Sequence, residues 1–68
     1  MDVNEKVSRE EVFRRTEEIF NNPHKASVWL NSPNYALDGQ VPLHLIGTDE
    51  GTALVLDELG RIEHGVFL

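Results

Sequence analysis

The sequence predicts an all-α fold, a small bundle of about four helices that includes one short turn-like helix and has no β-sheet. Two observations support this prediction. Apolar side chains recur at three- and four-residue spacing, and residues that cap helices precede these segments. No segment shows the alternation of apolar and polar side chains that is typical of a strand. With 68 residues, the chain is long enough for one domain at most.

The first helix is predicted over residues 9–21. Ser8 and Glu11 have the spacing of a capping box, in which each side chain accepts a hydrogen bond from the other residue's backbone N–H. In this interpretation residues 1–8 are a flexible N-terminal lead-in and residues 9–68 form the domain.

The charged face of this helix is expected to carry two ion pairs one turn apart, Glu10 with Arg14 and Glu11 with Arg15. The opposite, apolar face is expected to enter the core. Trp29 is interpreted as a core anchor rather than as a residue that stacks on a ligand. The core residues named by this pattern, together with those of the later helices, are Phe13, Ile19, Trp29, Leu43 and Leu59.

Two further helices and a turn are predicted in the middle of the chain. Asn22-Pro23 is a helix cap followed by proline at the first helical position, which predicts a helix over residues 23–31. A loop then leads to a turn at Asp38-Gly39. A proline predicts a short turn of helix over residues 42–46.

The last helix is predicted over residues 49–64, with Thr48 as its N-cap. The consecutive apolar residues Ala53 to Leu56 cannot all lie on one face, so the helix is expected to be buried on several faces. In a chain this short, that predicts a homodimer with this helix in or near the interface. Gly60 costs the helix about 1 kcal/mol relative to Ala, so a second helix is expected to approach closely there.

Composition excludes several classes of function. Twelve acidic and six basic residues give a net charge of −6, whereas a protein that binds nucleic acid needs a basic patch. No cysteine is present to form a disulfide or a zinc–thiolate site. No apolar run approaches the roughly 20 residues that span a bilayer, so no membrane association and a cytoplasmic location are expected.

The residues also argue against catalysis, metal binding and cofactor binding. His24, His44 and His64 do not have the four-residue spacing of a helical pair of metal ligands. The serines lie in cap or helix positions, which disfavours a Ser-His-acid arrangement, and no glycine-rich phosphate loop follows a strand. We therefore expect no cofactor, no metal and no enzymatic activity.

The C-terminal residues suggest a contact surface instead. Gly65 is a normal helix stop, because glycine adopts the left-handed conformation without steric cost. Val66, Phe67 and Leu68 follow it with no polar residue behind them. Such an apolar terminus has to pack on its own core or on a partner.

Several short motifs occur in the order of one known family. These motifs are Ala26-Ser27-Val28-Trp29-Leu30, Pro33-Asn34, Leu37-Asp38-Gly39, Pro42-Leu43-His44-Leu45, Thr48 to Gly51, and Gly60-Arg61-Ile62-Glu63-His64-Gly65-Val66. In this set, residues 9–68 resemble the toxin-binding domain of the MbcA/ParS/Xre antitoxins. The resemblance implies an all-helical module that tends to dimerise. It also implies that the module binds a RES-domain toxin, which is an enzyme that acts on NAD.

The resemblance further implies that the C-terminal part of the domain lies over the active-site cleft of the toxin. The residues that take this role by position are Arg61, Glu63, His64, Gly65, Val66 and Phe67, and the apolar terminus adds Leu68. The alternative, from a different class, is a dimerisation or structural module of a transcription regulator that binds no toxin.

Overall fold

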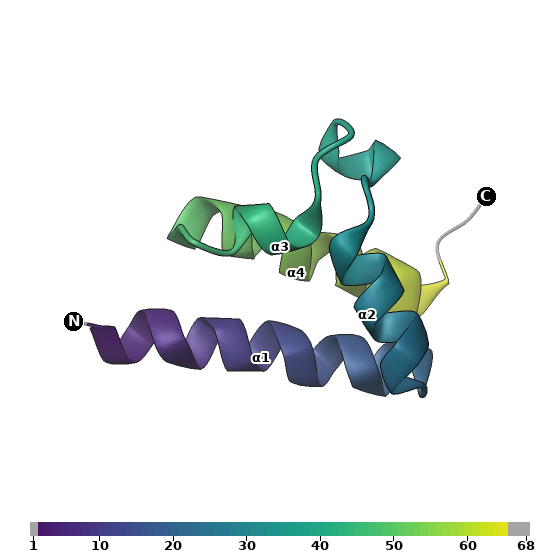
Figure 1. Cartoon of the computed structure of the whole chain (residues 1–68), viewed down its shortest axis with the longest axis horizontal. Helices are drawn as coiled ribbons and strands as arrows, with labels where there is room; N and C mark the ends of the chain where they lie inside the picture. The colour runs from purple at the N-terminus through teal and green to yellow at the C-terminus, as the bar shows by residue number, and fades with distance from the viewer. Residues whose placement is uncertain (1, 66–68) are drawn as a thin grey trace.

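The computed structural model describes the backbone of residues 2–65 and the side chains of residues 9–65 (Figure 1). It contains the helices α1 (Asp2–Phe20), α2 (Pro23–Asn31), α3 (Pro42–Leu45) and α4 (Asp49–His64), and the single 3-10 turn η1 (Tyr35–Leu37). Within these residues there is no strand, only an isolated bridge between Asn34 and Gln40. The predicted all-α fold is confirmed.

Helices α1 and α4 form the body of the molecule. They lie side by side and run in the same direction, so their C-terminal ends are at the same end of the molecule (Figure 1). α2 packs on α1, and α3 packs on α4. The C-terminal end of α4 is therefore supported by α1 rather than projecting alone into solvent.

The start of α1 differs from the prediction. The helix begins at Asp2, so Ser8 lies inside it and does not act as an N-cap. Ser caps only when the chain before it leaves the helix, and the preceding Glu5 and Lys6 are good helix formers that allow the helix to continue. At the other end, Asn21 has a positive φ of 53° and stops the helix one residue earlier than expected. The domain boundary at residue 8 stays a prediction.

The expected ion pairs of α1 are also replaced by others. Arg14 pairs with Glu11 and with Glu18, the latter at 3.4 Å, rather than with Glu10. Arg15 turns away from Glu11 and donates from Nη2 to Glu63 Oε1 of α4 at 2.9 Å. Helical spacing alone predicted local pairs, but the neighbouring helix offers Arg15 a partner that spacing cannot reveal.

The core is a cluster of six buried apolar residues, and every helix except α3 contributes to it: Val12, Leu30, Leu37, Ile46, Val55 and Leu59. Of the predicted core residues, Leu59 is fully buried, whereas Ile19, Trp29 and Leu43 are partly buried and pack against the cluster. The prediction that Phe13 is a core residue was wrong, because its side chain is 37% exposed. Val12 occupies the inward position instead, about 100° around the helix from Phe13.

The start of α2 and the loop after it are fixed by two asparagine side chains. Asn22 accepts a hydrogen bond from the Lys25 N–H at 3.0 Å, which confirms the predicted cap. Asn34 accepts from the Ala36 N–H at 2.9 Å and opens η1, a turn that the sequence interpretation described only as loop. The predicted turn at Asp38-Gly39 is confirmed, because both residues have a positive φ, 60° and 78°.

The junction between α3 and α4 depends on a glycine and a threonine. α3 ends at Leu45, one residue before the predicted end, and Thr48 caps α4 by accepting from the Gly51 N–H at 3.0 Å. A Cβ placed on Gly51 would lie 1.8 Å from the carbonyl oxygen of Leu45. Only glycine therefore allows this close approach. Gly60, where the approach was expected, has no atom within 4 Å of a built Cβ among the described residues.

Candidate functional site

Four of the seven residues predicted to contact a partner lie in the last turn of α4 and at its end. Arg61, Glu63 and His64 are helical, and Gly65 follows with a φ of 66° and donates its N–H to the carbonyl oxygen of Ile62 at 3.2 Å. This is the predicted glycine stop. The other three predicted residues, Val66, Phe67 and Leu68, lie outside the described residues.

Two of these side chains are held in place by neighbours. Arg61 Nη2 lies 3.2 Å from Asp57 Oδ2, and Arg61 Nη1 lies 3.6 Å from Glu58 Oε1, so its own helix orients the guanidinium. Glu63 accepts from Arg15 at 2.9 Å. His64 is exposed at the negative end of the helix dipole, which favours a basic side chain there.

The last turn thus presents two separate groups rather than one. Arg61 and His64 are three residues apart and share the exposed face of α4. Glu63 is separated from Arg61 by about 200° of helix rotation and faces α1. A cleft flanked by Arg61 and His64 is compatible with this geometry, whereas Glu63 reaches a partner only along the seam between α1 and α4.

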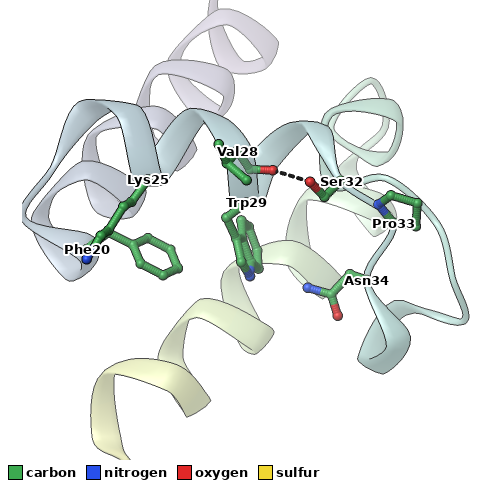
Figure 2. A pocket seen from close by; sticks show the side chains of 7 residues that line it. All are labelled: Phe20, Lys25, Val28, Trp29, Ser32, Pro33 and Asn34. Atoms are coloured by element: carbon green, nitrogen blue, oxygen red, sulfur yellow. Dashed lines mark hydrogen bonds between the residues drawn. The ribbon is translucent and has the colours of Figure 1, made fainter.

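A pocket of about 410 Å³ lies where α1 ends and α2 leads into the following loop (Figure 2). Trp29 packs against the core on one side, as expected for an anchor, and lines this pocket on the other. Its ring centroid is 6.1 Å from that of Phe20, with the ring planes tilted by 42°. The lining residues are Phe20, Lys25, Val28, Trp29, Ser32, Pro33 and Asn34.

The sequence interpretation did not find this pocket. The available signal was the pair Val28-Trp29, because two adjacent apolar residues on a short helix cannot both face the core. In the structure Val28 is 50% exposed. On α4, Leu54 and Val55 are also adjacent apolar residues. Val55 is buried, and the side chain of Leu54 is 53% exposed. Both positions are apolar surface that the described part of the chain does not cover.

Two further properties of the described residues bear on function. No three of their His, Asp and Glu side chains are placed to hold a metal ion together. None of the helices that the structure describes has the length and apolar character needed to cross a membrane.

Comparison with known proteins identifies the family. Residues 15–65 match the family described as the antitoxin Xre/MbcA/ParS C-terminal toxin-binding domain, a match that runs from the last third of α1 to the glycine stop of α4. A relative from Yersinia enterocolitica, named Antitoxin Xre, is 42% identical over 43 residues. These residues are 63% of this chain but 29% of the relative, so the chain spans less than a third of that protein. No solved structure matches the chain. The chain belongs to the family of antitoxin Xre/MbcA/ParS C-terminal toxin-binding domains.

Proposed function

We propose that this chain is the antitoxin module of a type II toxin–antitoxin system, and that it neutralises a RES-domain toxin, an enzyme that consumes NAD. The observation that carries the proposal is the family match, which extends through the last turn of α4 to Gly65. The role is binding rather than catalysis. A toxin that acts on NAD would work in the cytoplasm, and the antitoxin would act there too.

We propose further that neutralisation occurs by occlusion of the active-site cleft by the end of α4 and by the residues that follow it. Arg61 and His64 share an exposed face of the last turn and would flank the cleft. Glu63 would engage, as an anion, the groups of the cleft that bind phosphate. Phe67 follows the helix stop in the sequence and is the type of large side chain that dominates a contact when it fills a partner's pocket.

Charge supports the same partner. The chain carries a net charge of −6, and a site that binds NAD contains groups that attract phosphate. A negative antitoxin and a positive cleft would attract each other before contact, which raises the association rate. Arg15 and Glu63 brace the last turn of α4 against α1, so this part of the proposed surface is preorganised.

We also propose a homodimer with α4 in or near the interface. Leu54 is 53% exposed, and its neighbour Ala53 is exposed as well, so α4 has an apolar face directed to solvent. A small domain without disulfides gains stability when a second copy covers such a face. The dimer and the toxin contact use different parts of α4, so both can form together.

Co-expression with a RES-domain toxin encoded beside the antitoxin gene tests the proposal. Growth and cellular NAD should recover when the full chain is co-expressed and should stay low with an empty vector. Pull-down of the toxin by the tagged chain provides the direct measure of binding. Failure of both rescue and pull-down, with the chain present and folded, would contradict the proposal. It would favour the alternative, a dimerisation or structural module of a transcription regulator that binds no toxin.

A further inference from the structure

The pocket beside Trp29 shares no residue with the end of α4, and its walls are mostly apolar. Figure 2 shows Phe20 and Lys25 at one end of it, Pro33 and Asn34 at the other, and Val28 and Trp29 between them. At about 410 Å³, it has the volume of a small ligand site. Val28 is half exposed, however, so the pocket is a groove open along one side rather than an enclosed cavity.

The polar atoms of the groove leave hydrogen-bond donors for an occupant. Ser32 Oγ donates its hydrogen to the carbonyl oxygen of Val28 at 2.6 Å, so it has no second hydrogen to donate, and Asn34 Oδ1 accepts from the Ala36 N–H at 2.9 Å. The ammonium of Lys25 and the side-chain NH₂ of Asn34 can only donate. Lys25 takes part in none of the ion pairs that join the described residues.

We infer that this groove binds an extended segment of a partner protein in which an aromatic or aliphatic side chain is followed by a carboxylate. The apolar side chain lies against Val28 and Trp29, and the carboxylate pairs with Lys25. At the opposite end of the groove, the Asn34 NH₂ donates to a backbone carbonyl of the segment. The inference goes beyond the proposed function, because it concerns a surface that the occlusion of a toxin cleft does not use.

Two features favour a polypeptide segment over a small molecule. Small-molecule sites enclose most of the ligand surface, whereas this groove is open along α2. In addition, Tyr35 follows Asn34 directly and is 99% exposed, on a turn that Asn34 and the buried Leu37 hold in place. Tyrosine is enriched at protein interfaces, so a fully exposed tyrosine on a fixed turn beside the groove favours a protein partner.

Lys25 has to attract the carboxylate of the segment against the negative charge of the rest of the chain. With a net charge of −6, the molecule repels an acidic segment at long range. The carboxylate must therefore be held by a local partner, and Lys25 is the cation that lines the groove. Removal of the charge at Lys25 should therefore weaken binding of the segment more than removal of one positive charge elsewhere on the antitoxin.

Fluorescence of the full chain tests the inference directly, because Trp29 is its single tryptophan. The probe is the peptide N-acetyl-Phe-Leu-Asp amide, with N-acetyl-Phe-Leu-Asn amide as the neutral match. The Asp peptide should change Trp29 fluorescence saturably, with a dissociation constant on the order of 1 mM. The Asn peptide should bind about threefold to fivefold more weakly, the effect of one exposed ion pair.

Variants assign the effect to the groove. Lys25→Gln leaves the backbone N–H that Asn22 caps and should remove the preference for the Asp peptide. Arg9→Gln changes the net charge equally, outside the groove, and should leave the preference intact. Val28→Asp should abolish binding of both peptides.

Three results would overturn the inference. The first is a lack of saturable change up to about 10 mM peptide. The second is an equal loss of the preference in both charge variants, which would indicate general electrostatics. The third is tighter peptide binding by the Phe67→Ala variant of the full chain, which would show that the chain's own terminus occupies the groove.

Discussion

Arg15 and Glu63 are 48 residues apart in the sequence, yet Arg15 Nη2 donates to Glu63 Oε1 at 2.9 Å. This ion pair joins α1 to the last turn of α4, where the proposed toxin contact begins. Both side chains are partly exposed, so the pair contributes little to the free energy of unfolding. Its main effect is to orient Glu63 along the seam between the two helices.

A double-mutant cycle with Arg15→Gln and Glu63→Gln separates these two effects. Each single variant should lower the free energy of unfolding by less than about 1 kcal/mol, as measured by urea denaturation. If Glu63 contacts the toxin, Glu63→Gln should weaken toxin binding by more than Arg15→Gln does, which calorimetric titration measures.

The Arg14→Gln variant is the matched control for this cycle, because the ion pairs that Arg14 makes with other described residues lie within α1. It should leave toxin affinity unchanged. Equal effects of Arg14→Gln and Glu63→Gln on affinity would contradict a specific role of Glu63 at the contact.

Gly51 and Gly60 form a matched pair of helical glycines for a stability test. Gly51→Ala places a Cβ against the Leu45 carbonyl and should cost about 3 kcal/mol, the upper end of the usual cost of overpacking, because backbone has to move. Gly60→Ala meets no described atom and should stabilise α4 by up to about 1 kcal/mol. Urea midpoints measure both, and equal midpoints for the two variants would contradict the close contact at Gly51.

Thr48 should contribute about 1 kcal/mol through its cap of α4, the usual cost of replacing an N-cap residue by Ala. Thr48→Ala is the test and Thr48→Ser is the control, since Ser keeps the oxygen that accepts from the Gly51 N–H. Thermal unfolding followed by circular dichroism measures the difference. A Ser variant as unstable as the Ala variant would mean that the methyl group matters rather than the cap.

Removal of residues 66–68 should abolish toxin neutralisation while the fold persists. The six residues of the buried cluster and the Gly65 stop are all retained in the shortened chain. Cutting after Gly65 also preserves the Arg15–Glu63 pair, which a cut before Glu63 would remove. The measurements are growth rescue, for neutralisation, and circular dichroism, for folding.

Either of two outcomes would change the interpretation of the terminus. A shortened protein that still neutralises the toxin would rule out occlusion by these residues. A shortened protein that unfolds would mean that Val66 and Phe67 belong to the core instead of the contact surface.

Leu54→Glu should convert the proposed dimer to a monomer, because it places a charge on the exposed apolar face of α4. Analytical ultracentrifugation at tens of micromolar, an order-of-magnitude range for modest affinities, is the measurement. Leu54 is half exposed, so the domain itself should stay folded. A wild-type chain that sediments as a monomer would contradict the dimer without affecting the toxin proposal.

Local capping chemistry explains which elements could be predicted from the sequence. The bounds of α2 and α4 agree with prediction because Asn22-Pro23 and Thr48 act on neighbouring backbone, within three residues along the chain. The start of α1 was predicted wrongly because a capping motif reports only on the residues next to it. Ser8 fits a capping motif, but the residues before it also form helix, and a local motif cannot reveal this competition.

The candidate site was predictable only in part. The sequence located Arg61, Glu63, His64 and Gly65 at the end of a helix, and the structure has them there. It could not show that Glu63 faces α1, since its partner Arg15 comes from the opposite end of the chain. The groove beside Trp29 was missed because it forms between α1, α2 and a loop.

The sequence by itself determined the helical class, the caps that begin α2 and α4, and the glycine that stops α4, because each depends on residues within one helical turn. Tertiary structure alone decided which apolar residues are buried. Val12 and Phe13 are adjacent and similarly apolar, yet Val12 is fully buried whereas the side chain of Phe13 is 37% exposed. Burial depends on how helices pack, and packing brings together residues such as Gly51 and Leu45 whose contact no local pattern specifies.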